Sequence, residues 1–320
     1  MGYNPQSTPH NRNIFNRLLV LIGPTASGKT PVSIQIAEHL NAEIISADSR
    51  QVYKLMDIGT AKPAADDLKR VRHYFVDELM PDQEFNSGEF GKRGNEIIGD
   101  ILHRGKIPIV AGGSGLYVQA LVDGFFEGPA ADTSIRQDLY HRLKNEGAEV
   151  LLDELRKIDS GSAMKMLPSN TRRIVRALEV YKITGVPLSE MQKLKVKINF
   201  TPVFAGLRWD RKKLYERINL RADSMIECGL VEEVRQLREQ GYSSKLNALQ
   251  TVGYKEVFDY LDGRIDYGRM VELIKQNTRR YAKRQLTWFR NDERVRWFDV
   301  NDKRDFERVA LEISEYFDAG

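Results

Sequence analysis

The sequence contains a single cysteine, Cys228, among its 320 residues. One cysteine excludes a disulfide framework and a zinc site built from several cysteines. The longest apolar run, residues 18–22, is far shorter than the roughly 20 residues that a helix needs to cross a bilayer. The first 17 residues are polar and have no apolar core, so we expect a flexible tail and no secretory signal. Together these absences favour a cytoplasmic protein that does not enter a membrane.

The composition is that of an ordinary globular protein, with 41% hydrophobic and 29% charged residues. This balance allows a buried core and excludes disorder as the main state. The length suggests two domains, at about 150 residues each. The net charge of +4 is mild, so an argument for a polyanionic partner depends on where the basic residues lie.

Strand-like and helix-like segments alternate in the first third of the chain. Residues 18–22, 43–46, 74–76 and 107–111 predict strands, with helices after residue 29 and over 87–104. Further on we expect a returning strand at 202–207, helices at 211–228, 230–240 and 267–290, a strand at 295–298 and a last helix at 306–317. This order predicts an α/β fold with a parallel sheet. Residues 129–194 have only helical periodicity, so we expect a core of 18–128 and 199–320 interrupted by a helical insertion domain at 129–198.

A phosphate-binding loop follows the first predicted strand. Residues 23–30 fit the pattern G-x-x-x-x-G-K-[ST] at every defined position and lead into a predicted helix. In such a loop, backbone N–H groups face a phosphate at the helix N-terminus, Lys29 neutralises it and the Thr30 hydroxyl coordinates Mg²⁺. The predicted diphosphate or nucleotide site comprises Gly23, Pro24, Thr25, Ala26, Ser27, Gly28, Lys29 and Thr30. The loop indicates a P-loop core, and it fits nucleotide hydrolysis or a small-molecule kinase as well as rarer chemistry.

Two further polar segments follow predicted strands. Asp48 comes after the second strand, where a carboxylate near the phosphate loop could act as a general base, hold a metal-bound water or form an Asx turn. Ser114 lies in a second glycine-rich segment, where it could bind the same anion or cap a helix.

In combination these segments resemble the tRNA dimethylallyltransferases, also called tRNA isopentenyltransferases. The resemblance runs from about residue 18 to 299. It is carried by Gly-Pro-Thr-Ala-Ser-Gly-Lys-Thr at 23–30, Ser-Ala-Asp-Ser-Arg-Gln-Val-Tyr at 46–53, Asp-Ile-Gly-Thr-Ala-Lys-Pro at 57–63, Gly-Gly-Ser-Gly-Leu-Tyr at 112–117, Arg-Arg-Ile-Val-Arg-Ala-Leu-Glu-Val at 172–180, Gln-Thr-Val-Gly-Tyr-Lys-Glu at 250–256 and Lys-Arg-Gln-Leu-Thr-Trp-Phe-Arg at 283–290.

The resemblance implies transfer of a dimethylallyl group from dimethylallyl diphosphate to the exocyclic amine of the adenosine 3′ of the anticodon, with Mg²⁺ as cofactor. It implies that Asp48 is the general base and that Ser114 lies near the leaving group. The phosphate loop adds Lys29 to the predicted catalytic residues. The implied tRNA contacts are Asp48, Ser49, Arg50, Gln51, Ser114, Arg136, Arg172, Arg173, Ile174, Val175, Arg176, Gln250, Thr251, Val252, Gly253, Tyr254, Lys255, Lys283, Arg284, Gln285, Leu286, Thr287, Trp288, Phe289 and Arg290. Eukaryotic members can carry a zinc finger that one cysteine cannot supply, which indicates a bacterial-type enzyme.

Residues 275–290 support an RNA-binding surface on physical grounds, because they contain six basic residues and no acidic one. Lys275, Arg279 and Lys283 recur every four residues and would form one stripe along a helix, suited to a phosphate backbone. The alternative is a solvated helix face with buried aromatic residues. Arg172, Arg173 and Arg176 form a second basic cluster, and Arg217 and Arg221 are candidate diphosphate ligands.

These patterns predict a tRNA prenyltransferase that acts as a monomer on the anticodon stem-loop. The alternatives are a small-molecule or nucleotide kinase and a non-catalytic RNA-binding NTPase. We expect Cys228, before a glycine at a helix end, to be buried rather than reactive.

Overall fold

The computed structural model describes residues 16–124, 128–129, 132–194 and 198–319. It divides into two compact units, Met1–Val122 with Asn199–Gly320, here called the core unit, and Asp123–Ile198, the insertion unit. Residues 1–15 of the expected tail lie outside the described residues. The assignment of Arg17 to that tail is wrong, because this residue begins the first strand and its guanidinium lies 4.6 Å from the ring centroid of Phe317.

The core unit is built on one six-stranded parallel sheet with the strand order β3-β2-β4-β1-β5-β6. The strands are β1 (Arg17–Ile22), β2 (Ala42–Ala47), β3 (His73–Tyr74), β4 (Ile107–Gly112), β5 (Thr201–Trp209) and β6 (Val295–Val300). β1 and β2 are buried along their whole length, as expected for a parallel sheet covered by helices on both faces. The predicted α/β fold is thereby confirmed.

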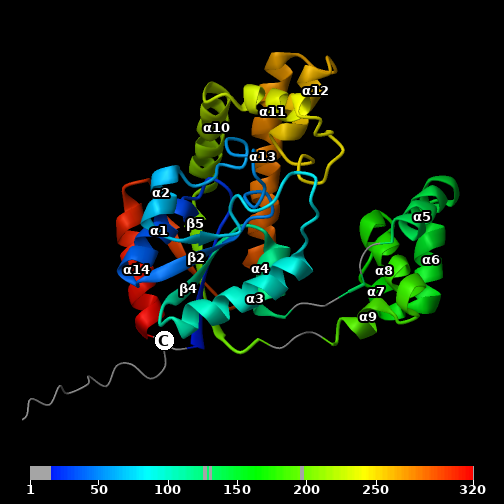
Figure 1. Ribbon diagram of the computed structural model, residues 1–320, viewed down its shortest axis with the longest axis horizontal. Helices are drawn as coiled ribbons and strands as arrows, with labels where there is room; N and C mark the ends of the chain where they lie inside the picture. Colours follow the sequence, from blue (N-terminus) through cyan, green and yellow to red (C-terminus); the bar gives the residue numbers. More distant parts are fainter. Residues whose placement is uncertain (1–15, 125–127, 130–131, 195–197, 320) are drawn as a thin grey trace, which may run out of the picture. The chain divides into compact units, whose positions relative to one another are not determined.

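The two faces of β1 pack into two different hydrophobic cores, because successive side chains of a strand point to opposite faces. Leu19 and Leu21 pack with helices α1 (Lys29–His39) and α14 (Asp305–Ala319). Leu18, Val20 and Ile22 pack with α3 (Ser87–His103) and α4 (Gly115–Val122). Figure 1 shows α1 and α14 side by side although they are the first and last helices of the chain.

The third strand is shorter than the sequence predicts. Only His73 and Tyr74 pair with β2, and the expected strand residues 75 and 76 do not. The backbone turns away because Phe75 and Asp77 adopt positive φ angles of 60° and 56°, a conformation that ends an extended strand.

Four helices of the core unit lie between β5 and β6 in the sequence. They are α10 (Arg211–Glu227), α11 (Leu230–Glu239), α12 (Tyr254–Leu261) and α13 (Tyr267–Arg290). The periodicity predicted three of them but not α12, nor the short α2 (Ala65–Arg70) near the start of the chain. Among the described residues, no helix combines the length and the apolar character that a membrane span requires.

The described part of the insertion unit is helical. It contains α5 (Thr133–Glu146), α6 (Ala148–Ile158), α7 (Ser160–Ala163), α8 (Thr171–Thr184) and α9 (Leu188–Met191). Leu139, Leu152 and Leu178 are central to a hydrophobic core of its own. Ile174 and Val175 also belong to this core and are 0% and 2% exposed, so the expectation that their side chains contact tRNA is wrong. Helical periodicity directs them inward, between the outward-facing residues of α8.

Candidate active site

The phosphate-loop sequence connects β1 to α1, which is the strand–loop–helix context that the motif requires. Gly28, the N-cap of α1, has a φ of 92°. A Cβ atom at this position would lie 2.3 Å from the ring of Phe306 on α14. Both the backbone conformation and the packing therefore demand glycine here.

Lys29 extends over the phosphate loop. Its Nζ donates hydrogen bonds to the carbonyl oxygens of Gly23 and Pro24, at 2.9 and 2.8 Å. Burial, together with the nearby charge of Arg221, lowers the pKa of Lys29 to about 8, and the carboxylate of Asp48 opposes this shift. The loop thus holds an ammonium group whose charge is costly without an anion nearby.

A cavity of about 940 Å³ adjoins this loop. It brings together the phosphate loop, the ends of β2 and β4, one side of α10 and one side of α13. Of the residues predicted from sequence, the cavity is lined by Thr25, Ala26, Ser27, Gly28, Lys29, Thr30, Asp48, Ser49, Arg50, Gln51, Arg217, Arg221, Gln250, Thr251, Val252, Gly253, Arg284 and Gln285.

Asp48 lies in this cavity directly after β2. One of its carboxylate oxygens, Oδ1, accepts a hydrogen bond of 2.9 Å from the backbone N–H of Arg50. This is the Asx turn that the sequence left open, and it fixes the side chain without using Oδ2. Ser114 lies next to the same turn, since its hydroxyl accepts a hydrogen bond of 3.2 Å from the N–H of Ser49.

Two arginines of α10, Arg217 and Arg221, face the phosphate loop and lie one helix turn apart. Nε of Arg217 donates to the carbonyl oxygen of Ala26 at 2.9 Å, and its guanidinium lies 4.3 Å from the ring centroid of Trp209. Burial lowers the pKa of Arg221, whereas Asp48 raises it. With Lys29, these two side chains concentrate positive charge around the loop.

Gln285 of α13 links the two glycine-rich segments. Its Oε1 accepts a hydrogen bond of 2.8 Å from the N–H of Thr25, and its Nε2 donates one of 3.0 Å to the carbonyl oxygen of Gly113. A Cβ atom on Gly113 would lie 2.1 Å from Nε2, so the contact also explains this glycine. Gln285 is 6% exposed and its amide is engaged by these two hydrogen bonds, a structural role that the sequence-based expectation of a tRNA contact did not include. The feature of the sequence that could have indicated the contact of Gln285 is Gly113, because a side chain at residue 113 would collide with it.

Comparison with known proteins agrees with this arrangement. The family model described as IPP transferase matches residues 51–292. The chain belongs to the IPP transferase family.

Relatives of similar length carry the corresponding name. A tRNA dimethylallyltransferase of Thermoanaerobacter sp. (strain X514) is 43% identical over 94% of this chain and 97% of its own length. That of Thermotoga maritima is 45% identical, over 89% and 92%. A crystal structure of the tRNA isopentenylpyrophosphate transferase from Bacillus halodurans matches with a TM-score of 0.71 and 41% identity, over 95% of this chain and 96% of that one. A eukaryotic dimethylallyltransferase acting on tRNA matches with a TM-score of 0.79 and 29% identity, over 93% and 77%. The resemblance inferred from the motifs is confirmed.

The basic stripe predicted on α13 of this IPP transferase is interrupted. Nζ of Lys275 forms an ion pair of 2.5 Å with Asp223, and Arg279 donates to the side chain of Asn219 at 2.6 Å. Both partners are on α10, which packs along α13. The stripe was predicted from spacing within one helix, and spacing does not reveal what the helix packs against. Beyond these two residues, Lys283, Arg284, Thr287, Trp288 and Arg290 are exposed.

Three further residues of the expected tRNA surface are turned inward. Phe289 is 3% exposed and Tyr254 is 0% exposed. Leu286 packs against Ala26 and Leu214 beside the phosphate loop. In this structure the side chains of Tyr254 and Phe289 therefore have almost no surface open to tRNA.

In the insertion unit, Arg136 and Arg176 both bind Glu179, whose side chain is 0% exposed. The Arg136 contact is 3.0 Å and the Arg176 contact 2.8 Å, so these guanidinium groups balance a buried charge rather than extending freely. Arg172 and Arg173 are exposed. The expectation that Cys228 is buried is wrong, since it ends α10 on the surface.

Proposed function

We propose that this chain transfers the dimethylallyl group of dimethylallyl diphosphate, the donor, to the exocyclic amine of the adenosine 3′ of the anticodon in tRNA, and releases diphosphate. One observation carries the proposal. The phosphate loop, three cationic side chains and the carboxylate of Asp48 line a single cavity. The loop and the cations suit a donor that carries a diphosphate, and the carboxylate suits an acceptor that loses a proton, as the exocyclic amine of adenine does.

The cations prepare the leaving group. Backbone N–H groups of the loop, Lys29, Arg217 and Arg221 would surround the diphosphate and stabilise the charge that develops as the allylic C–O bond breaks. Bound diphosphate would also add negative charge beside the buried ammonium of Lys29. Such preorganised electrostatic stabilisation is usually the largest single contribution to catalysis.

Magnesium fits this arrangement, because an ion held by phosphate oxygens needs only one or two protein ligands. Thr30 lines the cavity and would supply one of them. The ion would neutralise part of the diphosphate charge. Among the described residues there is no separate group of three or more His, Cys, Asp or Glu side chains suited to a metal.

Asp48 would act on the acceptor. The amine nitrogen attacks the allylic carbon, diphosphate departs with the electron pair of the C–O bond, and the carboxylate takes the amine proton. Oδ1 is engaged in the turn, so we assign the proton to Oδ2. The target adenine has to leave its stack, which costs least in a loop.

For the RNA we propose the exposed basic residues Lys283, Arg284 and Arg290 as backbone contacts, Trp288 as a stacking surface, and Arg172 and Arg173 as contacts from the insertion unit. We further propose that the enzyme works in the cytoplasm, where tRNA is found, and as a monomer.

The decisive experiment incubates the protein with the donor, Mg²⁺ and an anticodon stem-loop. The expected result is an increase in RNA mass by one C₅H₈ unit. In a parallel incubation that also contains ATP, an unchanged RNA together with a phosphorylated acceptor would instead establish a kinase. Nucleotide binding with neither product would establish an NTPase-type switch, and either outcome would overturn the proposal.

Asp48→Asn tests the base. The asparagine Oδ1 can still accept the Arg50 hydrogen bond, so the turn should persist while proton transfer is lost. We expect the single-turnover rate to fall by about 10²–10⁴-fold, with donor affinity unchanged. A rate near that of the wild type would show that Asp48 only stabilises the turn and is not the base.

A further inference from the structure

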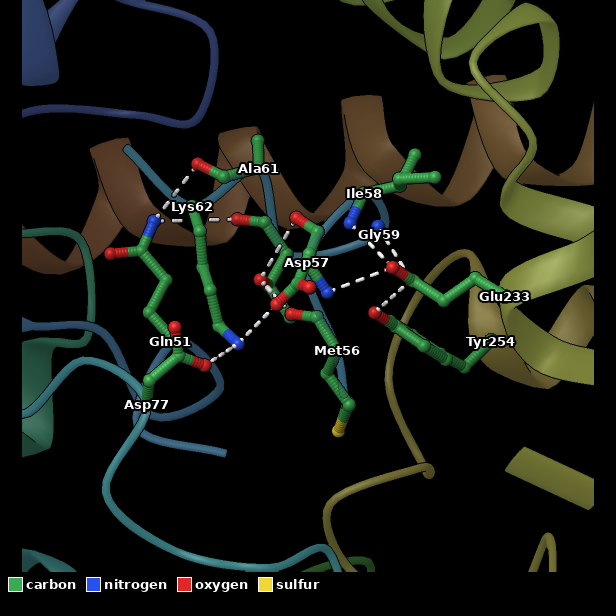
Figure 2. Close-up of polar contacts among 11 residues, drawn as sticks. Gln51, Met56, Asp57, Ile58, Gly59, Ala61, Lys62, Asp77, Glu233 and Tyr254 are labelled. Atoms are coloured by element: carbon green, nitrogen blue, oxygen red, sulfur yellow. Dashed lines mark hydrogen bonds and ion pairs between the residues drawn. The ribbon is translucent and has the colours of Figure 1, made fainter. Parts of the chain in front are cut away.

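A carboxylate outside the cavity holds a loop that lines it. Glu233, on α11, accepts hydrogen bonds from the backbone N–H groups of Asp57, Ile58 and Gly59, at 2.8, 2.7 and 3.1 Å, and from the hydroxyl of Tyr254 at 2.6 Å. Figure 2 shows these donors converging on the one side chain. Charge-assisted hydrogen bonds of this kind are about twice as strong as neutral ones.

Packing reinforces the hydrogen bonds. A Cβ atom on Gly59 would lie 2.4 Å from the ring of Tyr254 and 2.9 Å from the side chain of Leu230. Tyr254 itself is fully buried. The loop of residues 56–62 is therefore pressed against α11 and α12, which leaves no space for a side chain at the contact.

The other side of the 56–62 loop is tied to the turn that carries Asp48. Nε2 of Gln51 donates to the carbonyl oxygens of Thr60 and Ala61, at 3.4 and 3.1 Å. Oε1 of Gln51 accepts from the hydroxyl of Ser46, on β2, at 2.9 Å. Lys62, whose side chain is 5% exposed, forms one ion pair with Asp57 within the loop and a second with Asp77, beyond the end of β3.

Three segments that line the cavity are thus linked to this carboxylate, directly or through one neighbouring residue. They are residues 59–63, the turn at 48–51, and residues 250–253, which lead directly into Tyr254. Glu233 does not line the cavity itself. The donor groups on the other side are held separately, by the contacts of Lys29, Arg217 and Gln285 described above.

We infer that Glu233 is a positioning residue for the RNA acceptor: through the 56–62 loop and Tyr254 it orients the turn of Asp48 and the 250–253 segment against the nucleotide, without setting donor affinity. This inference rests on the proposed function. Since misplacement of reacting groups by about 1 Å can cost about 10²-fold in rate, loosening this contact should affect transfer strongly.

Glu233→Gln is the main test. The amide keeps the size of the side chain but has one accepting oxygen in place of two. Two of the four N–H and O–H groups that now bind Glu233 therefore lose their acceptor. We expect kcat/KM for the stem-loop to fall by about 10–100-fold, with the dissociation constant for the donor, measured by calorimetry, within about twofold of the wild type. Glu233→Asp keeps the charge and should recover part of the rate.

Two matched variants separate positioning from general effects. Glu232→Gln makes the same charge change one residue away, on an exposed side chain that pairs with Arg235, and should leave all kinetic constants unchanged. Tyr254→Phe removes one donor and keeps the three backbone ones, so it should lower kcat/KM less than Glu233→Gln does.

The readouts distinguish this inference from the proposed function. If the wild type does not modify the RNA, the proposed function fails. If the wild type transfers the group and Glu233→Gln transfers it equally well, or loses donor affinity to the same extent as RNA turnover, the positioning role is refuted. A further result would also refute it: the activity lost in Glu233→Gln equals the fraction of that variant found unfolded by thermal denaturation, and Tyr254→Phe transfers the group at the wild-type rate.

Discussion

Gln285 provides the sharpest test of how the cavity is built, because sequence and structure assign it different roles. Its family motif suggests contact with tRNA, whereas its side chain joins Thr25 of the phosphate loop to Gly113 of the second glycine segment. Gln285→Met keeps the length of the side chain and removes both polar atoms. The variant therefore deletes the two hydrogen bonds with little change in packing.

The expected magnitude follows from the groups left behind. A buried donor or acceptor without a partner costs about 1–3 kcal/mol. The Thr25 contact is only partly buried, and water can replace some of it, whereas the Gly113 contact is buried. If the phosphate loop shifts so that water solvates the N–H group of Thr25, the shift distorts the site that binds dimethylallyl diphosphate. Affinity for dimethylallyl diphosphate then weakens by about 5–150-fold, which corresponds to the full cost of the unpaired group.

The assay measures two dissociation constants for each variant, that of dimethylallyl diphosphate by calorimetry and that of the stem-loop by fluorescence anisotropy. Gln285→Met should weaken the first and leave the second unchanged. Arg284→Gln, one residue away on the exposed face, should do the reverse and reduce the salt dependence of RNA binding. Loss of RNA affinity in Gln285→Met with normal donor affinity would refute the linking role.

Three further predictions concern single charges. Because the pKa of Lys29 is about 8 in the free enzyme and bound diphosphate raises it, affinity for inorganic diphosphate should fall as pH rises above about 8. In Lys29→Met the affinity should depend on pH only through the titration of diphosphate itself. Calorimetry that gives the same pH dependence for the wild type and the variant would contradict this. Hydrogen bonds from Arg104 hold the pKa of Glu43 near 2, below its usual 4.5, so this carboxylate stabilises the fold above pH 4.5 and loses its effect as pH falls toward 2. Glu43→Gln should accordingly reduce the free energy of unfolding by on the order of 3 kcal/mol at pH 7, and urea titration should find a smaller difference at pH 3. Replacing Arg172 and Arg173 with alanine should lower the slope of log affinity against log salt by about 0.7–0.9 per lost contact. An unchanged slope would show that these two arginines do not contact RNA phosphates. Arg176→Ala should instead destabilise the insertion unit, because it removes one of the two arginines that bind the buried Glu179.

Much of the core unit could be predicted from local sequence because its signals are local. The apolar runs of β1 and β4 and the glycines around Lys29 each specify their own conformation. The α12 helix was not predicted, and the end of β3 depends on positive φ angles at Phe75 and Asp77. Phenylalanine does not signal such a conformation, although aspartate adopts it more readily than most residues.

The contacts that organise the site are distant in sequence, which explains why they were not predicted. Gln285 is 260 residues from Thr25, and Glu233 is 174 residues from Gly59. Nothing in the pattern around either residue distinguishes it from a polar residue on a surface. The same holds for Lys275, whose partner Asp223 belongs to another helix.

The motif at residues 283–290 illustrates why closeness in sequence does not imply a shared role. An α-helix turns by about 100° per residue, so inward and outward positions alternate within every turn. Gln285 and Phe289 point inward to the glycine loops and the core, whereas Lys283, Arg284 and Arg290 are exposed. One continuous motif therefore serves two surfaces. Substitutions on its inner side should act on the donor, and those on its outer side should act on the RNA.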